Sequence, residues 1–366
     1  MYFARRKRGA PGQVLVMGKE KLNVAIVGSS GYTGGELMRI LLGHPNVTVS
    51  AITSERSAGQ PITAIFPHLA SLTKLVCEPL DPAVIAKKAS LVFLALPHVT
   101  AQDAANKFRE LGTKVVDLSA DYRLADPAVY EQWYEHGHQY PELLKQAVYG
   151  LPELRREQIK KASLIANPGC YPTSAILGLA PLIKQDRVDL SSIIIDSKSG
   201  VTGAGRSPAL AYHFPEANEG LMAYKIGTHR HTPEIEQELS ALAGQPVTVS
   251  FTPHLIPMNR GILTTIYARP KENIDTTKLH EQYREFYKQE PFVRVLPLGQ
   301  QPNVRNVRGS NFCDIGVTAD PRTGRAIVVS AIDNLVKGAA GQAVQNMNLM
   351  MAFEETAGLA NAGLFP

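Results

Sequence analysis

The sequence predicts an α/β protein of two domains, a doubly wound parallel sheet followed by a second unit built on a mixed sheet. The chain has 366 residues, more than one hydrophobic core usually serves. Up to about residue 166, short apolar strands alternate with helical segments, which is typical of a parallel sheet covered by helices. Beyond residue 193 the strand candidates have fewer helices between them, which favours a mixed or antiparallel sheet.

The individual elements follow from local patterns. Apolar or alternating runs predict strands at 22–27, 47–53, 91–96, 114–118 and 164–166, and amphipathic runs predict helices at 36–42 and 101–111. Further along, we expect an apolar helix at 175–182 and strands at 193–197, 247–251, 262–267, 315–318 and 326–331. A last helix at 338–351 could return to the first domain. The expected boundaries are therefore 21–166 with 338–366 for one domain and 167–337 for the other.

Composition and charge exclude several classes of protein. Hydrophobic residues make up 44% of the chain and charged residues 19%, as in a globular rather than a disordered protein. No apolar run approaches the roughly 18 residues of a membrane span. The formal charge of +5 includes four basic residues at positions 5–8, so the rest is near neutral and nucleic acid is not expected as a partner. The three cysteines form no Cys-x-x-Cys pair, which argues against a disulfide framework and a metal site.

Residues 1–20 are interpreted as a basic extension. Arg, Lys and Gly are frequent there, without helical or strand periodicity. The segment has neither the apolar stretch of a secretory signal nor the serines of a transit peptide, and we expect a cytoplasmic protein. Either this extension is flexible or translation begins at Met17.

A glycine-rich turn follows the first strand. Glycines at every third position permit a tight turn and close approach of a pyrophosphate, to which N–H groups at the start of the next helix can donate. The spacing is looser than Gly-x-Gly-x-x-Gly, but its place directly after the first strand favours a dinucleotide site. The residues expected to contact the dinucleotide are Gly28, Ser30, Gly31, Tyr32, Thr33 and Gly34.

The end of the second strand distinguishes NAD from NADP. A site for NAD usually has an acid there that accepts from the ribose hydroxyls. This chain has Ser54 and Arg56, which suit a 2′-phosphate because they supply a donor and a positive charge. Glu55 would repel that phosphate if it turned inward, and the segment could also be a plain solvated turn. We predict NADP(H) as the cofactor.

Cys170 is the candidate nucleophile. It lies in the turn 167–173, between the strand at 164–166 and the helix at 175–182. A cysteine at the start of a helix is near the positive end of the helix dipole, which favours the thiolate. Cys77 and Cys313 lie in strand-like segments and are expected to be buried and inert.

A nucleophilic thiol needs a partner for proton transfer, and His229 and His231 are the candidates. They share a face if their segment is extended, and with Arg230 they suit an anionic substrate and a general base, although a polar loop is the alternative. Thr232 as N-cap and Pro233 at the first helical position predict a helix immediately afterwards.

Three further segments are candidates for ligand binding. The loop 199–206 is rich in glycine and hydroxyl groups and ends in an arginine. The segment 117–123 closes a parallel strand, at the edge where such sheets bind ligands, and His98 follows Pro97 at the end of another strand. The loop 199–206 and the segment 117–123 could also be simple connecting loops.

Taken together, the motifs resemble those of the N-acetyl-gamma-glutamyl-phosphate reductases, arginine-biosynthesis enzymes related to the aspartate-semialdehyde dehydrogenases. The resemblance covers about residues 22–351. It rests on GSSGYTGGEL (28–37), ALPH (95–98), LSADYR (118–123), PGCYPT (168–173), SGVTGAGR (199–206), HRHTPEI (229–235), PMNRGI (257–262) and DNLVKG (333–338). The chain departs from the family pattern at Val99, where glycine is frequent, and at Tyr122, where phenylalanine is commoner, so the geometry of those loops is open.

The resemblance implies a Rossmann-type NADP-binding domain and an α+β domain for catalysis and oligomerisation, hence a homo-oligomer, dimer or tetramer. It implies NADPH-dependent reduction of N-acetyl-L-glutamyl 5-phosphate to the 5-semialdehyde and phosphate, through a thioester on Cys170. His229, with His231 second, would be the acid–base residue or hold the substrate carboxylate. The implied substrate-binding residues are Ser119, Arg123, Ser199, Gly200, Arg206 and Tyr224, and the implied cofactor contacts include Pro97, His98 and Asn334.

Two rival functions remain. A relative in lysine biosynthesis reduces an aminoadipyl phosphate carried on a small acidic protein, and its motifs are largely shared. The near-neutral body offers no obvious basic docking surface, which favours a free small-molecule substrate. A non-catalytic NADP-binding sensor is the other rival, but such a protein has no need of Cys170 and His229.

Overall fold

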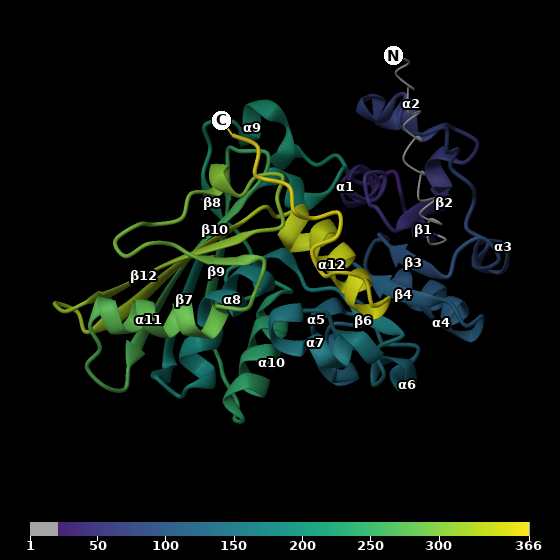
Figure 1. Cartoon of the computed structure of the whole chain (residues 1–366). Helices are drawn as coiled ribbons and strands as arrows, with labels where there is room; N and C mark the ends of the chain where they lie inside the picture. Colours follow the sequence, from purple (N-terminus) through teal and green to yellow (C-terminus); the bar gives the residue numbers. More distant parts are fainter. Residues whose placement is uncertain (1–20, 366) are drawn as a thin grey trace, which may run out of the picture.

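The computed structural model describes residues 21–365 and contains two β-sheets (Figure 1). The predicted extension at 1–20 lies outside the described residues. The six-stranded sheet has the order β2-β1-β3-β4-β6-β5, and the seven-stranded sheet has the order β11-β12-β13-β10-β7-β9-β8. Among the described helices, none is long and apolar enough to cross a membrane.

The six-stranded sheet is entirely parallel, as the sequence predicts. Its strands are β1 (Leu22–Val27), β2 (Val47–Thr53), β3 (Leu91–Leu94), β4 (Lys114–Asp117), β5 (Val148–Tyr149) and β6 (Leu164–Ala166). Successive β1 residues face opposite layers. Val24 and Ile26 pack with α1 (Tyr32–Leu41), while Ala25 and Val27 pack with α4 (Ala101–Glu110). The sheet is therefore covered on both faces, which is the doubly wound arrangement.

Further helices connect these strands. They are α2 (Ile62–Ile65), α3 (Pro82–Ala86), α5 (Pro127–Tyr134), α6 (Pro141–Leu144) and α7 (Pro152–Lys161). A π-helical turn at Val336–Ala340 leads into the last helix, α12 (Gly341–Met350). Apolar side chains of both elements lie in the same core cluster as β1 and α1, so the π-helical turn and α12 pack on the first sheet (Figure 1).

The seven-stranded sheet is mixed, also as predicted. β10 pairs antiparallel with β7 and β13, whereas β7–β9 and β11–β12 are parallel pairs. Its strands are β7 (Val188–Gly200), β8 (Met222–Ala223), β9 (Ser250–Ile256), β10 (Ile262–Pro270), β11 (Val293–Val295), β12 (Cys313–Asp320) and β13 (Arg325–Ile332). One core cluster joins its buried face to α8 (Cys170–Lys184), α10 (Thr232–Ala243) and α11 (Thr276–Tyr287).

Some predicted boundaries are wrong. The helices expected at 36–42 and 175–182 begin earlier, at Tyr32 and Cys170, because glycine and proline hide the helical periodicity of their first turns. The strand expected at 247–251 begins only at Ser250. Val247 and Val249 are buried as their alternation suggests, but their N–H groups donate to side chains of α10 instead of a strand.

Candidate active site

A cavity of about 280 Å³ brings together most of the residues proposed for catalysis and substrate binding. It is bounded by the start of α8, the end of β7 and the segment before α10. Of the predicted residues, those that line it are His98, Cys170, Ser199, Gly200, Tyr224, His229 and His231. The lining also contains Lys225 and Arg230, whose positive charges suit an anionic ligand.

Cys170 is the first residue of α8, and Gly169 is the N-cap in an extended conformation. The turn before it is held by Glu234, whose Oε1 accepts the N–H of Gly169 at 2.8 Å and the hydroxyl of Tyr149 at 2.8 Å. On the other side, a Cβ on Gly338 would lie 2.7 Å from the Cβ of Cys170, so only glycine lets the π-helical turn pack so closely. Cys170 therefore has a fixed position between α10 and the π-helical turn.

The predicted resting thiolate is wrong. Burial raises the pKa of the Cys170 thiol to about 11, and this effect outweighs the positive charge of Arg123 and the nearby backbone N–H groups, which lower it. Position at a helix start is visible in the sequence, whereas the loss of water around the sulfur is not. In the free protein Cys170 is a neutral thiol that a base must deprotonate. Cys77 and Cys313 are buried, as expected.

We therefore expect alkylation of Cys170 by iodoacetamide to accelerate about tenfold per pH unit between about pH 6 and 9, because the thiolate fraction rises in that proportion below the pKa. The rate would be measured by mass spectrometry of the peptide containing Cys170, with a Cys170→Ser variant reporting background labelling. A plateau below about pH 8 would contradict a neutral resting thiol.

His231 lies directly against the cysteine turn. A Cβ on Gly169 would be 2.6 Å from His231 Nε2, so the imidazole occupies the space that a side chain would need. Burial is the main reason that the pKa of His231 lies well below its usual value, and the ring is neutral near pH 7. The predicted cap is wrong by one residue: His231 is the N-cap of α10, and Thr232 is its first residue.

His229 is the first group in a hydrogen-bonded relay. Burial lowers its pKa to about 4, and its Nδ1 accepts the backbone N–H of His231 at 3.1 Å. The neutral ring therefore carries its proton on Nε2, which lies 3.4 Å from Tyr224 Oη. Tyr224 donates to Tyr171 Oη at 3.2 Å, and Tyr171 donates to the carbonyl oxygen of His254 at 3.3 Å. His229 is arranged as a hydrogen-bond donor, while His231 stands free to accept a proton.

Two predicted substrate-binding residues lie beneath the cavity instead of facing it. Arg123 is buried and donates to the carbonyl oxygens of Asn167 (2.8 Å) and Leu118 (3.0 Å), with Glu234 Oε2 at 3.4 Å. The Ser119 hydroxyl donates to Asp117 Oδ2 at 2.7 Å. Both side chains are already paired, so they support the cysteine turn and the end of β4.

Glu234 is a residue of the site that the sequence did not reveal. It is 1% exposed, and its carboxylate joins Arg123, Tyr149 and the Gly169 N–H. In the sequence it looks like an ordinary acid in the first turn of a helix. The available signal was its distance of three residues from His231, which places both side chains at the same end of α10.

Asn334 and Arg206 hold the loop 199–206 from two sides. Asn334 Oδ1 accepts the N–H of Gly261 at 2.7 Å, and its Nδ2 donates to Thr202 Oγ1 at 3.0 Å. Arg206 does not line the cavity; its Nη1 donates to the carbonyl oxygen of Ser30 at 2.7 Å, on the glycine-rich turn. The structure thus places Arg206 at the cofactor side of the loop.

The glycine-rich turn has the features of a phosphate site. Gly28 has φ +85°, and a Cβ there would lie 2.4 Å from the carbonyl oxygen of Ala95. Gly31 is the N-cap of α1 without a side-chain cap, and no acid lies in the first turn of α1. The N–H groups of Tyr32 and Thr33, its first two residues, have no intrahelical acceptor and can donate to an anion.

The neighbouring loops agree with a site for NADP. Ser54 is 2.8 Å from the Ser30 hydroxyl, which joins the end of β2 to the turn. Glu55 is turned away, since its Oε1 accepts the N–H of Leu80 at 3.0 Å, and Arg56 is exposed. His98 Nδ1 accepts the N–H of Ala120 at 3.0 Å, which fixes the loop after Pro97.

Val99, which stands where the family frequently has glycine, has a strained backbone conformation. It has φ +75°, a conformation that β-branched residues rarely adopt and that glycine adopts freely. Its N–H donates to Asp121 Oδ1 at 2.7 Å, which holds the loop in place despite the strain.

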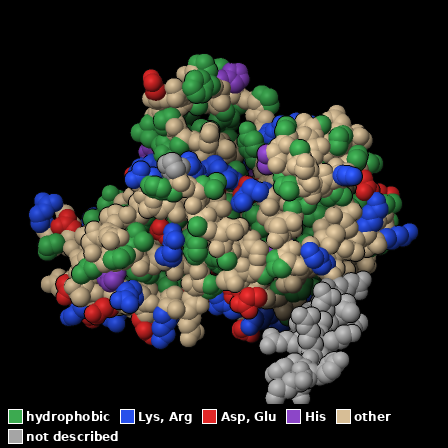
Figure 2. All heavy atoms as spheres, turned by 45° about the horizontal axis from the view of Figure 1, so that its top comes forward, with side chains coloured by type: hydrophobic (Ala, Val, Ile, Leu, Met, Phe, Trp, Pro, Cys, Tyr) green, Lys and Arg blue, Asp and Glu red, His purple; other side chains and the backbone are tan. Residues whose placement is uncertain are grey.

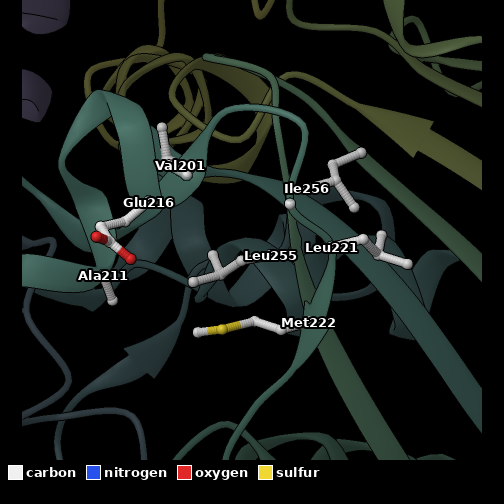
Figure 3. Close-up of a pocket in the computed structure, with 9 residues that line it drawn as sticks. Val201, Ala211, Glu216, Leu221, Met222, Leu255 and Ile256 are labelled. Atoms are coloured by element: carbon white, nitrogen blue, oxygen red, sulfur yellow. The ribbon is translucent and has the colours of Figure 1, made fainter.

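A second cavity of about 130 Å³ is lined by Val201 of the loop 199–206 (Figure 3). Its lining is apolar apart from Glu216, with Val201, Met222 and Leu255 among its residues, and Leu255 also lines the larger cavity. No predicted site residue lines it. Within residues 21–365, no group of His, Cys, Asp and Glu side chains is arranged to hold a metal ion.

Comparison with known proteins identifies two family models along the chain. Residues 23–162 match the semialdehyde dehydrogenase NAD binding domain, and residues 170–334 match the semialdehyde dehydrogenase dimerisation domain. The N-acetyl-gamma-glutamyl-phosphate reductase of Geobacter metallireducens is 62% identical over 346 residues, 94% of this chain and 100% of the relative. The enzyme of the same name from Desulforudis audaxviator is 54% identical over 345 residues, 94% of this chain and 100% of the relative.

Solved structures agree at the level of the fold. Aspartate semialdehyde dehydrogenase II from Vibrio cholerae superimposes with a TM-score of 0.70 at 18% identity, covering 91% of this chain and 99% of the other. The aspartate semialdehyde dehydrogenase of Candida albicans, solved with NADP, gives a TM-score of 0.66 at 16% identity, covering 91% and 99%. The chain therefore belongs to the semialdehyde dehydrogenase family, within its group of N-acetyl-gamma-glutamyl-phosphate reductases.

Proposed function

We propose that the protein catalyses the NADPH-dependent reduction of N-acetyl-L-glutamyl 5-phosphate to N-acetyl-L-glutamate 5-semialdehyde and phosphate, in L-arginine biosynthesis. The observation that carries this proposal is the meeting of Cys170 with two neutral histidines in one cavity, in a chain 62% identical to relatives of that name. Such a constellation is suited to acyl transfer through a thioester.

The first half-reaction forms the thioester. His231 takes the proton of Cys170, and the sulfur attacks the carbonyl carbon of the acyl phosphate. The new S–C bond forms as the C–O bond to phosphate breaks, and phosphate leaves with that electron pair. The ring of His231 is available as an acceptor for this proton because burial leaves it neutral near pH 7.

The second half-reaction releases the aldehyde. NADPH, when bound, supplies the hydride that reduces the thioester. The residues suited to hold it are those of the glycine-rich turn together with Ser54, Arg56, Pro97, His98 and Asn334. The S–C bond of the reduced adduct then breaks as its oxygen re-forms the C=O bond of the aldehyde. The Cys170 sulfur takes the proton held by His231, so Cys170 leaves as the thiol and His231 is neutral again. His229 donates through Nε2 to the oxygen chain of Tyr224 and Tyr171, which orients the polar end of the substrate.

Substrate anchoring is proposed for the polar lining of the cavity. Ser199, Gly200 and Tyr224 face the substrate, and Lys225 and Arg230 supply positive charge for its carboxylate and phosphate. Arg123 and Ser119 act indirectly, by holding the backbone beneath the cavity.

Arg56→Ala is expected to weaken NADPH binding about tenfold or more and NADH binding less than about twofold, because only NADPH carries the 2′-phosphate that a guanidinium would bind. Titration by fluorescence of the bound nicotinamide measures both constants. Equal weakening of the two would mean that Arg56 does not read the 2′-phosphate.

We further propose that residues 21–166 and 338–366 form the NADP-binding domain and that residues 167–337 form the catalytic and oligomerisation domain of a cytoplasmic homo-oligomer, dimer or tetramer. Two observations support self-association: the match to a dimerisation domain and an apolar strip on the open face of the second sheet. Ile194 is 40% exposed and is paired across strands with Tyr267, which is paired with Ile327, and the last two are half-buried.

The reaction is best tested in reverse, because the acyl phosphate is unstable. N-acetylglutamate semialdehyde, phosphate and NADP⁺ should give phosphate-dependent formation of NADPH, abolished by alkylation of the thiol. If a folded protein that binds NADPH forms no NADPH in this assay, the carrier-linked aminoadipyl phosphate becomes the favoured substrate. If that substrate is not turned over either, a non-catalytic NADP-binding sensor becomes the favoured function. Over most of the face shown in Figure 2, Lys and Arg are mixed with Asp and Glu, which disfavours an extended docking surface for an acidic carrier protein.

A further inference from the structure

The loop 199–206, here called the substrate loop, rests on a neighbouring turn at 258–261, here called the supporting turn. Backbone and side-chain hydrogen bonds join the two. Three backbone N–H groups of the substrate loop donate to carbonyl oxygens of the supporting turn: Gly200 to Gly261 (2.9 Å), Val201 to Met258 (2.9 Å) and Thr202 to Asn259 (3.2 Å). The hydroxyl of Thr202 also donates to the carbonyl oxygen of Asn259 at 2.6 Å. The position of the substrate loop is therefore set by the supporting turn.

Arg260 reaches from the supporting turn to the helix of the cofactor site. Its Nη2 lies 2.7 Å from Oε2 of Glu36, and the two side chains are 19% and 8% exposed. Glu36 is the fifth residue of α1, one turn after the N–H groups that are suited to a phosphate. A mostly buried ion pair is screened less by salt than an exposed one, so this contact between the two segments persists at ionic strengths that weaken a surface pair.

The same guanidinium faces a second carboxylate. Its Nε is 3.7 Å from Asp333 Oδ2 and is buried without a hydrogen-bond partner. Asp333 Oδ1 accepts hydrogen bonds from the N–H groups of Leu335 (2.8 Å) and Val336 (3.2 Å). The backbone carbonyl oxygen of Asp333 accepts a hydrogen bond from the N–H group of Gly338 at 2.9 Å. Asp333 thus shapes the π-helical turn that packs against Cys170.

We propose that Arg260 is a positioning residue that couples the cofactor site to the substrate site. This inference rests on the proposed function and adds to it. One planar guanidinium lies between a carboxylate of the cofactor helix and a carboxylate behind the nucleophile, and Arg260 belongs to the turn whose other residues accept the hydrogen bonds of the substrate loop. Binding of NADP(H) on α1 and of the acyl group beside the substrate loop are therefore linked through one side chain. Arg206 also joins the loop to the glycine-rich turn, but it is exposed, so its contribution is smaller.

Arg39 provides a matched control. Its Nη2 lies 2.7 Å from Oε1 of the same Glu36, but it belongs to α1 itself, and its other contact is the carbonyl oxygen of Gly309. Arg39→Gln therefore removes one positive partner of Glu36 while leaving the link to the supporting turn in place.

The test uses the reverse reaction with N-acetylglutamate semialdehyde, phosphate and NADP⁺, and direct titration of NADPH. Arg260→Gln should raise the KM for NADP⁺ and the KM for the semialdehyde together, each about fivefold or more, the size of a typical coupling between sites. Arg39→Gln should leave the KM for the semialdehyde within about twofold of the starting protein. Arg260→Lys keeps the positive charge but lacks the planar set of donors of a guanidinium. Its KM for NADP⁺ should therefore lie between those of the starting protein and Arg260→Gln.

A loss of folding is separated from a loss of coupling by the double variant Glu36→Gln with Arg260→Gln, which removes both charges of the ion pair between the supporting turn and α1 and should still show both raised KM values. The proposal is overturned by a lower kcat with both KM values unchanged, by a rise in only one KM, or by the same rise in Arg39→Gln. If the starting protein shows no phosphate-dependent turnover, the proposed function fails. The role of Arg260 is then decided by NADPH titration, in which Arg260→Gln must weaken binding and Arg39→Gln must not.

Discussion

Cys170→Ser is expected to reduce turnover by at least about a thousandfold, because a serine hydroxyl in the same position is a far weaker nucleophile and forms an ester in place of the reducible thioester. NADPH binding should stay within about twofold of the starting value, since Cys170 lies in the cavity at the start of α8 and the glycine-rich turn lies at the start of α1. Turnover would be followed as NADPH formation in the reverse reaction, and binding by nicotinamide fluorescence.

Cys77→Ser is the matched control for this experiment. Its sulfur is buried 3.7 Å from the Ser29 hydroxyl and does not line the cavity. This variant should retain turnover and its sensitivity to alkylation. Turnover of Cys170→Ser close to that of the starting protein would rule out the covalent route, and loss of NADPH binding in that variant would mean that the two sites are not separate.

The sequence was sufficient to predict the position of those residues whose immediate neighbours in the chain indicate the local structure. The glycine-rich turn follows a compact apolar strand, and Cys170 precedes an apolar helix, so local patterns alone place both at the ends of elements. The parallel first sheet and the mixed second sheet could be predicted for the same reason, since their strands differ in how regularly helices separate them.

The sequence was not sufficient where long-range packing decides the outcome. Arg123 is 111 residues from Glu234, so nothing local indicates that its guanidinium turns inward and pairs beneath the cavity. The protonation state of Cys170 was mispredicted for a related reason. The start of a helix is a local feature, whereas the desolvation that raises the thiol pKa comes from segments far along the chain that close around it. Arg206 was assigned to the substrate because of its loop, although its contact is with Ser30.

His231→Asn is expected to lower kcat by about a hundredfold or more, the usual contribution of a general base, whereas His229→Asn should lower it by about tenfold. The difference follows from the hydrogen bonds. His229 Nδ1 is occupied by the His231 N–H, so His229 donates through Nε2, and only His231 stands free beside the cysteine turn. Steady-state kinetics of both variants in the reverse reaction, with thermal melts as a control for folding, would measure the difference.

The pH dependence provides a second readout of the same assignment. Burial lowers the pKa of His229 to about 4 and that of His231 well below its usual value, so both rings are neutral above about pH 5, and neither loses activity by protonation between about pH 6 and 8. With a neutral base present, kcat should change little across that range. In His231→Asn the thiolate must come from Cys170 unaided, and because its pKa is about 11 the residual rate should rise with pH throughout. A larger loss in His229→Asn, or a residual rate in His231→Asn that is independent of pH, would reverse the two roles.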